Sequence, residues 1–192
     1  MRGTVLAVVA LSAISQPALA ADQNVFGFAG RFTDRFIEHA LFPFTASYEN
    51  NYILGAGYQM FFLGDDGGLK LGAEVGAALR IGSPNISGEV WAGPVLRYDG
   101  LIVTENVKFS AAVTGGISYA TDPIGIEAQR EIENNGDSSL LFYMAPELSV
   151  SFAEHPNTEY FLRLQHRSGG WKTLGNFQDS ANAVSLGIRQ SF

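Results

Sequence analysis

The sequence predicts an all-β fold, an eight-stranded antiparallel up-and-down transmembrane β-barrel with a polar, filled interior. Three observations predict it. The chain has 192 residues, of which 16% are charged and 46% hydrophobic, whereas a soluble domain carries about 25% charged residues. Hydrophobic residues alternate with polar or small ones with a period of two, which is typical of strands wetted on one face. No run after residue 20 reaches the roughly 18 apolar residues that a membrane helix requires.

The composition also excludes several kinds of site. The chain has 12 Lys and Arg against 19 Asp and Glu, a net charge of −7, and no basic patch with interleaved aromatic residues, so we expect no nucleic-acid partner. It has no cysteine, which excludes disulfides, thiolate metal sites and a cysteine nucleophile.

Residues 1–20 match a secretory signal peptide. Arg2 is the positive residue at the start, an apolar segment follows from Val5 to Ile14, and Ala18 to Ala20 form a cleavage site of small residues. We therefore expect residues 21–192 to form the mature barrel, located in the cell outer membrane.

Eight strands are expected, each about as long as a tilted strand needs to cross a bilayer. In Leu69–Ile81, for example, leucine, valine, alanine and isoleucine alternate with Lys70, Glu74, Arg80 and small residues. In chain order the expected strands are Val25–Thr33, Tyr52–Leu63, Leu69–Ile81, Ser87–Tyr98, Val107–Tyr119, Leu140–Phe152, Tyr160–Arg167 and Val184–Phe192.

The expected connections are short on one side and mostly longer on the other, as in outer-membrane barrels. The periplasmic turns are expected at 64–68, around Asp99 and Gly100, and at 153–157. The outer loops are expected at 34–51, 83–86, 121–138 and 169–181.

A secreted, lipocalin-like barrel would also alternate, but with its apolar face inward. Here the polar face consists largely of Gly, Ala, Ser and Thr with scattered charges of both signs, which suits a crowded barrel interior better than a soluble exterior. The charged residues assigned to this inner face are Arg31, Lys70, Glu74, Arg80, Glu89, Arg97, Lys108, Glu147, Arg163, Arg167 and Arg189. The final Phe192 resembles the aromatic end of outer-membrane barrel chains.

One strand ends in a motif with possible chemistry. By the alternation, His166 and Ser168 continue the outward face of Tyr160 and Leu162, two residues apart near the outer rim. Polar side chains on a lipid-facing wall are costly without a function. An imidazole beside a hydroxyl is the arrangement of an acyl-transfer nucleophile, because the imidazole accepts the hydroxyl proton and later returns it.

A His-x-Ser motif at the end of the penultimate strand, followed by a loop and a last strand ending in Phe, resembles the PagL family of lipid A 3-O-deacylases. The resemblance implies that His166 is the general base and Ser168 the nucleophile. It also implies an asparagine directly after the serine, for the oxyanion hole, and an acidic residue about a dozen positions on, which orients the histidine.

This sequence departs from that pattern at two positions. Gly169 replaces the asparagine, so the oxyanion would be stabilised by backbone N–H groups of Gly169 or Gly170. Ser180 occupies the position of the acid, and the neighbouring Asp179 is the candidate orienting residue.

Other polar and aromatic residues have simpler explanations. His39 and His155 are expected to be solvated, and Trp91 to pack in the interior. Trp171 is expected to be an interface anchor or to contact substrate. The acidic residues of the long loop are expected on a solvated face, with divalent ions between them and lipopolysaccharide phosphates as the alternative; these are Glu127, Glu131, Glu133 and Asp137.

The resulting hypothesis is an outer-membrane esterase that removes an ester-linked acyl chain from lipid A, with lipopolysaccharide and membrane lipids as partners and no cofactor or metal. Alternatives are a non-catalytic structural or adhesive barrel and, disfavoured by the crowded interior, a narrow pore. The acyl position cleaved and the choice between monomer and homodimer stay open.

Overall fold

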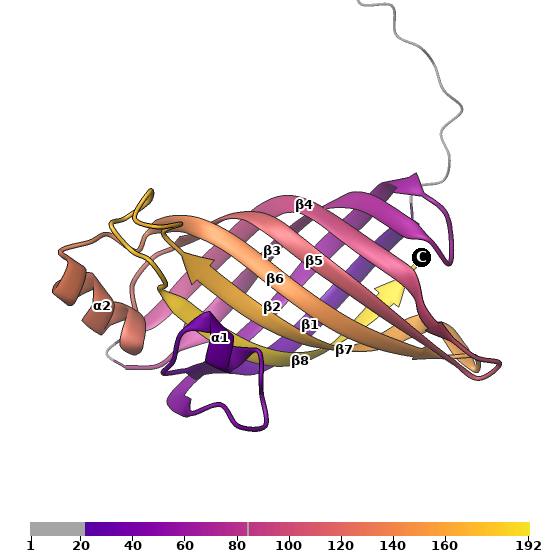
Figure 1. The fold of residues 1–192 in the computed structure, drawn as a ribbon, viewed down its shortest axis with the longest axis horizontal. Helices are drawn as coiled ribbons and strands as arrows, with labels where there is room; N and C mark the ends of the chain where they lie inside the picture. Colours follow the sequence, from indigo (N-terminus) through magenta and orange to yellow (C-terminus); the bar gives the residue numbers. More distant parts are fainter. Residues whose placement is uncertain (1–21, 84) are drawn as a thin grey trace, which may run out of the picture.

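The computed structural model describes residues 22–83 and 85–192, so the predicted signal peptide lies outside the described residues. The described chain is a closed barrel in which eight antiparallel strands pair in chain order and β8 closes on β1 (Figure 1). The strands are β1 Asp22–Thr33, β2 Tyr48–Gly64, β3 Leu69–Ile81, β4 Ile86–Val103, β5 Val107–Ala120, β6 Leu140–Phe152, β7 His155–Ser168 and β8 Ala181–Ser191. The predicted fold class is confirmed.

The alternation predicted from sequence determines which residues face outward. Along β3 every second side chain is exposed on the outer wall, while Lys70, Glu74 and Arg80 are buried inside. Large hydrophobic side chains cover the outer wall on every strand. Closure of the sheet pairs the backbone groups internally, which allows this wall to lie in lipid. None of the helices in the described ranges is long and apolar enough to cross a membrane.

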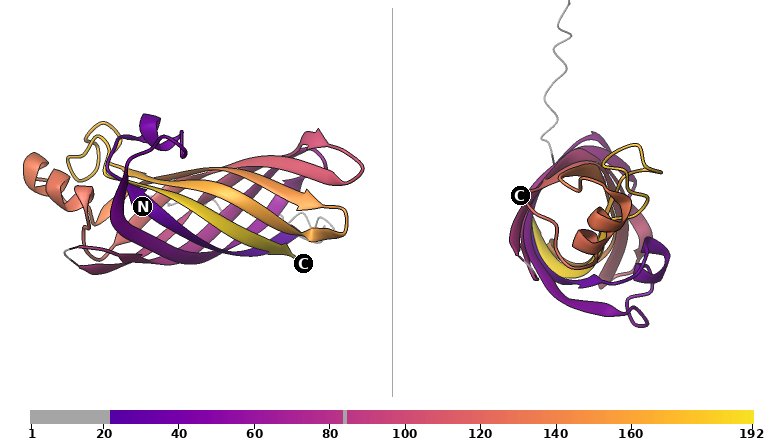
Figure 2. Two further views of the ribbon diagram at one scale, coloured as in Figure 1. Left: turned by 90° about the horizontal axis from the view of Figure 1, so that it is seen from below. Right: turned by 90° about the vertical axis from the view of Figure 1, so that its left-hand side faces the viewer.

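The two ends of the barrel differ. One end has short turns, and the other has longer loops that carry α1 (Ile37–Ala40) and α2 (Ile126–Asn134). The view along the barrel axis shows α2 over the opening, whereas α1 lies on the outer flank (Figure 2). The fold is that of an outer-membrane β-barrel, in which the longer loops face outward from the cell.

One turn is not where the sequence predicted it. β4 continues past Asp99 and Gly100 to Val103, with a register shift between Tyr98 and Ile102. Asp99 is buried, and its carboxylate pairs with Arg97 at 2.5 Å and with Lys70 at 3.2 Å. These ion pairs compensate for its removal from water. The other boundaries move by up to five residues, and β7 begins at His155.

The assignment of Arg31 to the inner face is also wrong. Phe26, Phe28 and Phe32 of β1 are buried in the interior, so the alternation places Arg31 on the outer wall, where it is exposed. The error arises because the inner face of β1 is aromatic rather than polar.

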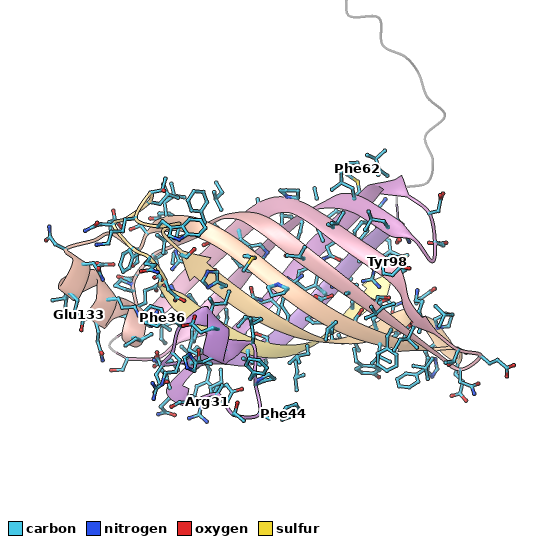
Figure 3. All side chains as sticks on the ribbon, viewed as in Figure 1. Arg31, Phe36, Phe44, Phe62, Tyr98 and Glu133 are labelled. Carbon is cyan, nitrogen blue, oxygen red and sulfur yellow. The ribbon has the colours of Figure 1, made fainter. Side chains whose placement is uncertain are left out.

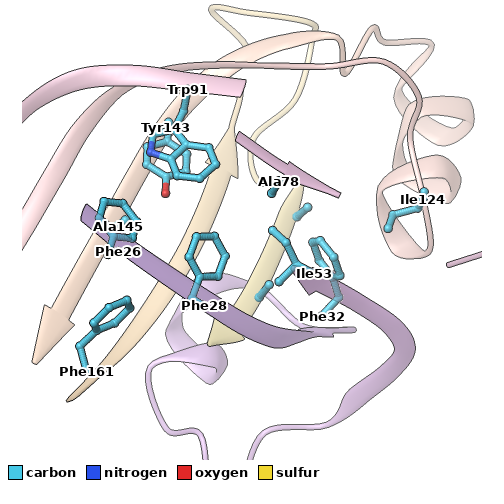
Figure 4. Packing of buried hydrophobic residues seen from close by; sticks show 12 residues of the cluster. Phe26, Phe28, Phe32, Ile53, Ala78, Trp91, Ile124, Tyr143, Ala145 and Phe161 are labelled. Carbon is cyan, nitrogen blue, oxygen red and sulfur yellow. The ribbon is translucent and has the colours of Figure 1, made fainter. Parts of the chain in front are cut away.

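Aromatic side chains fill the middle of the barrel (Figure 4). Trp91 stacks on Tyr143 with ring centroids 5.4 Å apart, as the interior placement of Trp91 predicted, and Phe26 meets Phe161 edge to face at 6.0 Å. Glycine is required opposite these rings, since a Cβ on Gly76 would lie 2.1 Å from the Trp91 ring. The filled cross-section leaves no room for an open channel at this level.

A network of buried ion pairs surrounds the aromatic layer. Arg163 donates to both carboxylate oxygens of Glu74, at 2.9 and 2.7 Å, and to Glu147 at 2.9 Å. Arg189 bridges Glu147 at 2.7 Å and Glu159 at 2.9 Å. Each buried charge therefore has an opposite charge beside it, as removal from water requires.

A second cluster closes the loop end, and it corrects the expectation for the acidic loop. Glu127 of α2 is not solvated but fully buried, paired with Arg80 and, at 2.5 Å, with Arg167. Burial raises the pKa of Glu127, but Arg167 and Arg80 outweigh it and hold the pKa below the ordinary value. Glu133 and Asp137 are exposed as predicted, whereas Glu131 is half-buried and accepts from the Ser138 backbone at 3.1 Å.

Replacing Arg163 should destabilise the barrel strongly. Arg163→Met leaves Glu74 buried without a cation and Glu147 with Arg189 alone, which costs about 3 to 5 kcal/mol. The measurement is reversible urea unfolding in lipid vesicles. Arg35→Gln, which removes an exposed loop cation, serves as the control and should change little; equal effects of the two variants would contradict the network.

Replacing Glu127 should release α2 while leaving the strands intact. Because the pKa of Glu127 is lowered, its pairing is fully present above the ordinary value of 4.5 and is lost as pH falls through the lowered value. Glu127→Gln imitates the protonated form at neutral pH. Hydrogen exchange measured by mass spectrometry should accelerate in 126–134 and not in β1–β8, whereas Glu133→Gln should resemble the parent; unchanged exchange in Glu127→Gln would refute the anchoring role.

Candidate functional site

The predicted His166 and Ser168 lie at the loop end of β7, on the outer face of the barrel. The strand alternates here, with Gln165 and Arg167 buried in the interior. Both motif residues line a groove of about 830 Å³. Most of its exposed lining is apolar and includes Phe36, Phe142, Met144 and Trp171, while Glu38, Gln178 and Asp179 are polar residues that also line it.

The groove lies between two outer loops that meet the barrel wall. The segment around α1 forms one side, with Phe36 and Ile37, and the loop after β7 forms the other, with Gly170 and Trp171. Figure 3 shows Phe36 at the loop end of the barrel. The enclosure makes His166 only 8% exposed although it is on the outer wall.

Asn182 is the direct partner of His166, and the sequence analysis missed it. The two residues are opposite each other in the β7–β8 ladder, and His166 Nδ1 lies 2.7 Å from Asn182 Oδ1. A signal was available, since Asn182 continues the outward face of Val184 and Leu186 by one step. It is a fully buried polar residue on a wall of apolar ones.

The hydrogen bonds of Asn182 determine which tautomer a neutral His166 adopts. Its Nδ2 donates to Asp179 Oδ1 at 2.9 Å and to the Arg35 carbonyl at 3.0 Å. Both partners are acceptors, so the amide nitrogen faces them and the amide oxygen faces His166. Nδ1 of a neutral His166 must then carry the proton, which leaves Nε2 as the free base.

Asp179 does not contact His166 directly, as a simple orienting acid would, because Asn182 lies between them. Its carboxylate instead joins three segments: besides Asn182, Oδ1 accepts from Arg130 of α2 at 2.9 Å, and Oδ2 accepts from the Ile37 N–H at 2.9 Å. Arg130 also covers the Phe36 ring at 4.6 Å. Asp179 therefore fixes the orientation of Asn182, and through it His166, relative to both outer loops.

Ser168 is half-buried at the end of β7, opposite Phe142 of β6. Within the described chain no hydrogen bond joins its hydroxyl to His166. Two outward residues of one strand are about 6.6 Å apart along it, and catalytic hydrogen bonds often tighten only when substrate is bound.

The glycines after Ser168 explain the departure from the asparagine pattern. A Cβ on Gly169 would lie 2.3 Å from the carbonyl oxygens of both Leu174 and Phe177, so no larger residue fits there. The loop folds back through Leu174 N–H to Gly169 O at 2.8 Å. Gly170 lines the groove beside Ser168, whereas Gly169 is buried and does not line it.

Among the other residues singled out from the sequence, Trp171 lines the groove, whereas Ser180, His39 and His155 do not. Ser180 is buried, and its hydroxyl donates to Glu127 at 2.7 Å rather than reaching His166. Trp171 is 89% exposed at the edge of the groove, in keeping with either role expected of it. His39 and His155 are exposed. In 22–83 and 85–192 no group of three or more His, Asp or Glu could hold a metal ion.

Comparisons with known proteins place the fold. No protein-family model matches the sequence, and no curated protein does. Among solved structures, the chain is similar to "the outer membrane enzyme PagL" with a TM-score of 0.58 and 16% identity, over 87% of this chain and 98% of that one. It is also similar to Neisserial surface protein A, NspA, with a TM-score of 0.54 and 13% identity, over 89% and 97%. At these identities the likeness shows the outer-membrane barrel fold alone.

The Asn182 contact predicts the tautomer of His166, which nitrogen NMR can observe in detergent micelles. The chain has three histidines, so His39 and His155 act as internal references. The parent should carry the His166 proton on Nδ1, and Asn182→Ala should populate the Nε2–H form because the acceptor is gone. Asn157→Ala, at an exposed position near the start of β7, is the matched control. A parent spectrum with the proton on Nε2 would contradict the assignment.

Proposed function

We propose that the protein is an outer-membrane esterase that removes an ester-linked acyl chain from lipid A, with Ser168 as nucleophile and His166 as general base. The observation that carries the proposal is the hydrogen-bonded series Asp179, Asn182, His166 at a groove that also contains Ser168. A buried series of this kind on a lipid-facing wall has a cost, and orienting a base beside a hydroxyl gives it a function.

The chemistry follows from the tautomer. Ser168 Oγ attacks the ester carbonyl carbon while its proton moves to His166 Nε2, and the carbonyl π electrons move to the oxygen. The tetrahedral intermediate collapses, and the bond between the acyl carbon and the sugar oxygen breaks. The leaving sugar oxygen takes the proton from Nε2. Water then attacks the acyl-enzyme by the same route, which releases the fatty acid and restores Ser168.

Two features of the chain would stabilise the charges that develop. The Gly169 and Gly170 N–H groups would donate to the oxyanion, where loss of one donor costs about 100- to 1,000-fold in rate. The Asn182 carbonyl, held by Asp179, would stabilise the imidazolium by accepting from Nδ1–H. This arrangement differs from a serine triad, since an amide replaces the carboxylate next to the histidine.

The position of the groove suits a lipid substrate. Acyl chains of an outer-leaflet lipid already lie along the outer wall, so only the ester must reach Ser168. Apolar side chains such as Phe142 and Met144 line the groove beside the motif. The solvated loops at its upper edge would admit the hydrolytic water. PagL, described as an outer membrane enzyme, has the same fold.

A non-catalytic barrel is the alternative. NspA, described as a surface protein, has the same fold, so the fold does not decide between the two. The alternative gives no function to the Asn182 contact with His166 or to the exclusion of a side chain at Gly169.

Mass spectrometry of lipid A from cells that express each variant tests the proposal. Lipid A should lose one acyl chain with the parent, and Ser168→Ala should lower this activity at least about 1,000-fold. Asn182→Ala should lower it about 100-fold by disordering the base. Ser47→Ala, at an exposed loop serine outside the groove, is the matched control.

Folding is verified by the heat-dependent mobility of each barrel in gels. Unchanged lipid A with folded parent would favour the non-catalytic barrel. Deacylation that persists in Ser168→Ala would assign the activity to another residue.

A further inference from the structure

Arg31 is a cation on the lipid-facing wall. It lies on β1 opposite Tyr52 of β2 and Val184 of β8, both on the outer face. The other arginines within described strands point inward and are buried; they are Arg80, Arg97, Arg163, Arg167 and Arg189. Arg31 therefore differs from these arginines, because its side chain is on the outer face of the barrel.

The surrounding residues hold the Arg31 guanidinium in place without neutralising it. Its carbon lies 5.7 Å from the ring centroids of both Tyr48 and Tyr52, and Nε donates to the Glu49 carbonyl at 2.6 Å. The Glu49 carboxylate points elsewhere, to the Ile126 N–H at 3.0 Å. In the described ranges no carboxylate lies within ion-pairing distance of Arg31, so both terminal nitrogens are available to an external acceptor.

Arg31 lies near the loop end of the outer wall, where we expect the lipid headgroups. Toward the turn end, the outer face of β1 continues with Ala29 and Val25, which are apolar. Toward the loop end the strand stops two residues later, at Thr33. Paired tyrosines at such a boundary are typical of membrane interfaces, where a long cationic side chain reaches phosphates.

The loop beside Arg31 is itself suited to a membrane surface. Phe42 is 66% exposed and Phe44 fully exposed. The Tyr48 hydroxyl donates to the Pro43 carbonyl between them at 2.7 Å, which ties these rings to the Arg31 site. Figure 3 shows Arg31 and Phe44 on the same flank of the barrel. Exposed phenylalanines next to a guanidinium without an ion-pair partner indicate a surface that meets both the acyl and the headgroup region of a lipid.

We propose that Arg31, held between Tyr48 and Tyr52, binds the phosphate of an outer-leaflet lipid. The terminal guanidinium nitrogens form an end-on pair of hydrogen bonds to two phosphate oxygens, while Nε keeps its bond to Glu49. The site is on a wall that lipid covers, which favours a lipid phosphate over a free ion. It does not depend on the chemistry at Ser168.

Native mass spectrometry in a non-ionic detergent tests the site with two probes, bisphosphorylated lipid A and the same lipid A after phosphatase treatment. The protein carries Ser168→Ala throughout, so the lipids stay intact whether or not the parent is an esterase. This protein should retain the phosphorylated lipid about tenfold better than the dephosphorylated one. Adding Arg31→Gln should remove the preference, and Arg31→Lys should restore it in part.

Arg35→Gln is the matched control, since it removes the same charge from an exposed arginine that pairs with Asp34 at 3.5 Å, and it should keep the preference. Equal retention of the two lipids before Arg31 is changed, or equal loss in Arg35→Gln and Arg31→Gln, would overturn the proposal. Displacement of lipid A by an equal concentration of inorganic phosphate would show that the ligand is not a lipid.

Discussion

The barrel wall must satisfy its own backbone, because lipid offers no hydrogen bonds. Eight strands closed by the β1–β8 pairing meet that requirement, and the alternation then sends apolar side chains outward and charged ones inward. The same rule makes every polar side chain on the outer wall expensive. The exceptions near the loop end, His166 with Asn182 and Arg31, are therefore the places for which we propose functions.

Side chains of α2 contact both the barrel interior and the residues behind the outer groove. Glu127 enters the barrel mouth and pairs with Arg80 and Arg167, while Arg130, on the same helix, reaches Asp179. Asp179 in turn holds Asn182. One helix thus seals the barrel and orients the residues behind His166, so the site depends on ion pairs inside the barrel as well as on its own loop.

Much of the fold could be predicted because lipid enforces a strict period of two. The bounds of Leu69–Ile81 and Leu140–Phe152 agree with β3 and β6 without change. Arg31 was assigned to the wrong face because phenylalanine fills the interior beside β1, and a period alone does not say which face is apolar. The prediction of a turn at Asp99 is wrong because an ion pair with Arg97 keeps this acidic residue within β4.

The site was predictable in part for the same reason. Alternation along β7 places His166 and Ser168 on one face, and alternation along β8 places Asn182 on the outer face. That Asn182 lies opposite His166 follows only from the β7–β8 register, which the sequence does not specify. Glu127 looked like one of several solvated acids, since nothing local reveals that two arginines from distant strands meet it. Contacts that depend on how the loops fold cannot be predicted from the alternation along the strands.

Covalent labelling of the serine tests the central claim most directly. A long-chain alkyl fluorophosphonate is presented in micelles to the folded barrel. Ser168 Oγ should attack its phosphorus and expel fluoride, while the hydroxyl proton moves to His166, so that the serine gains one phosphonyl group. Peptide mapping should place that group on Ser168, and His166→Ala should abolish the reaction. A folded parent that stays unlabelled, or that is labelled equally without His166, would contradict the account.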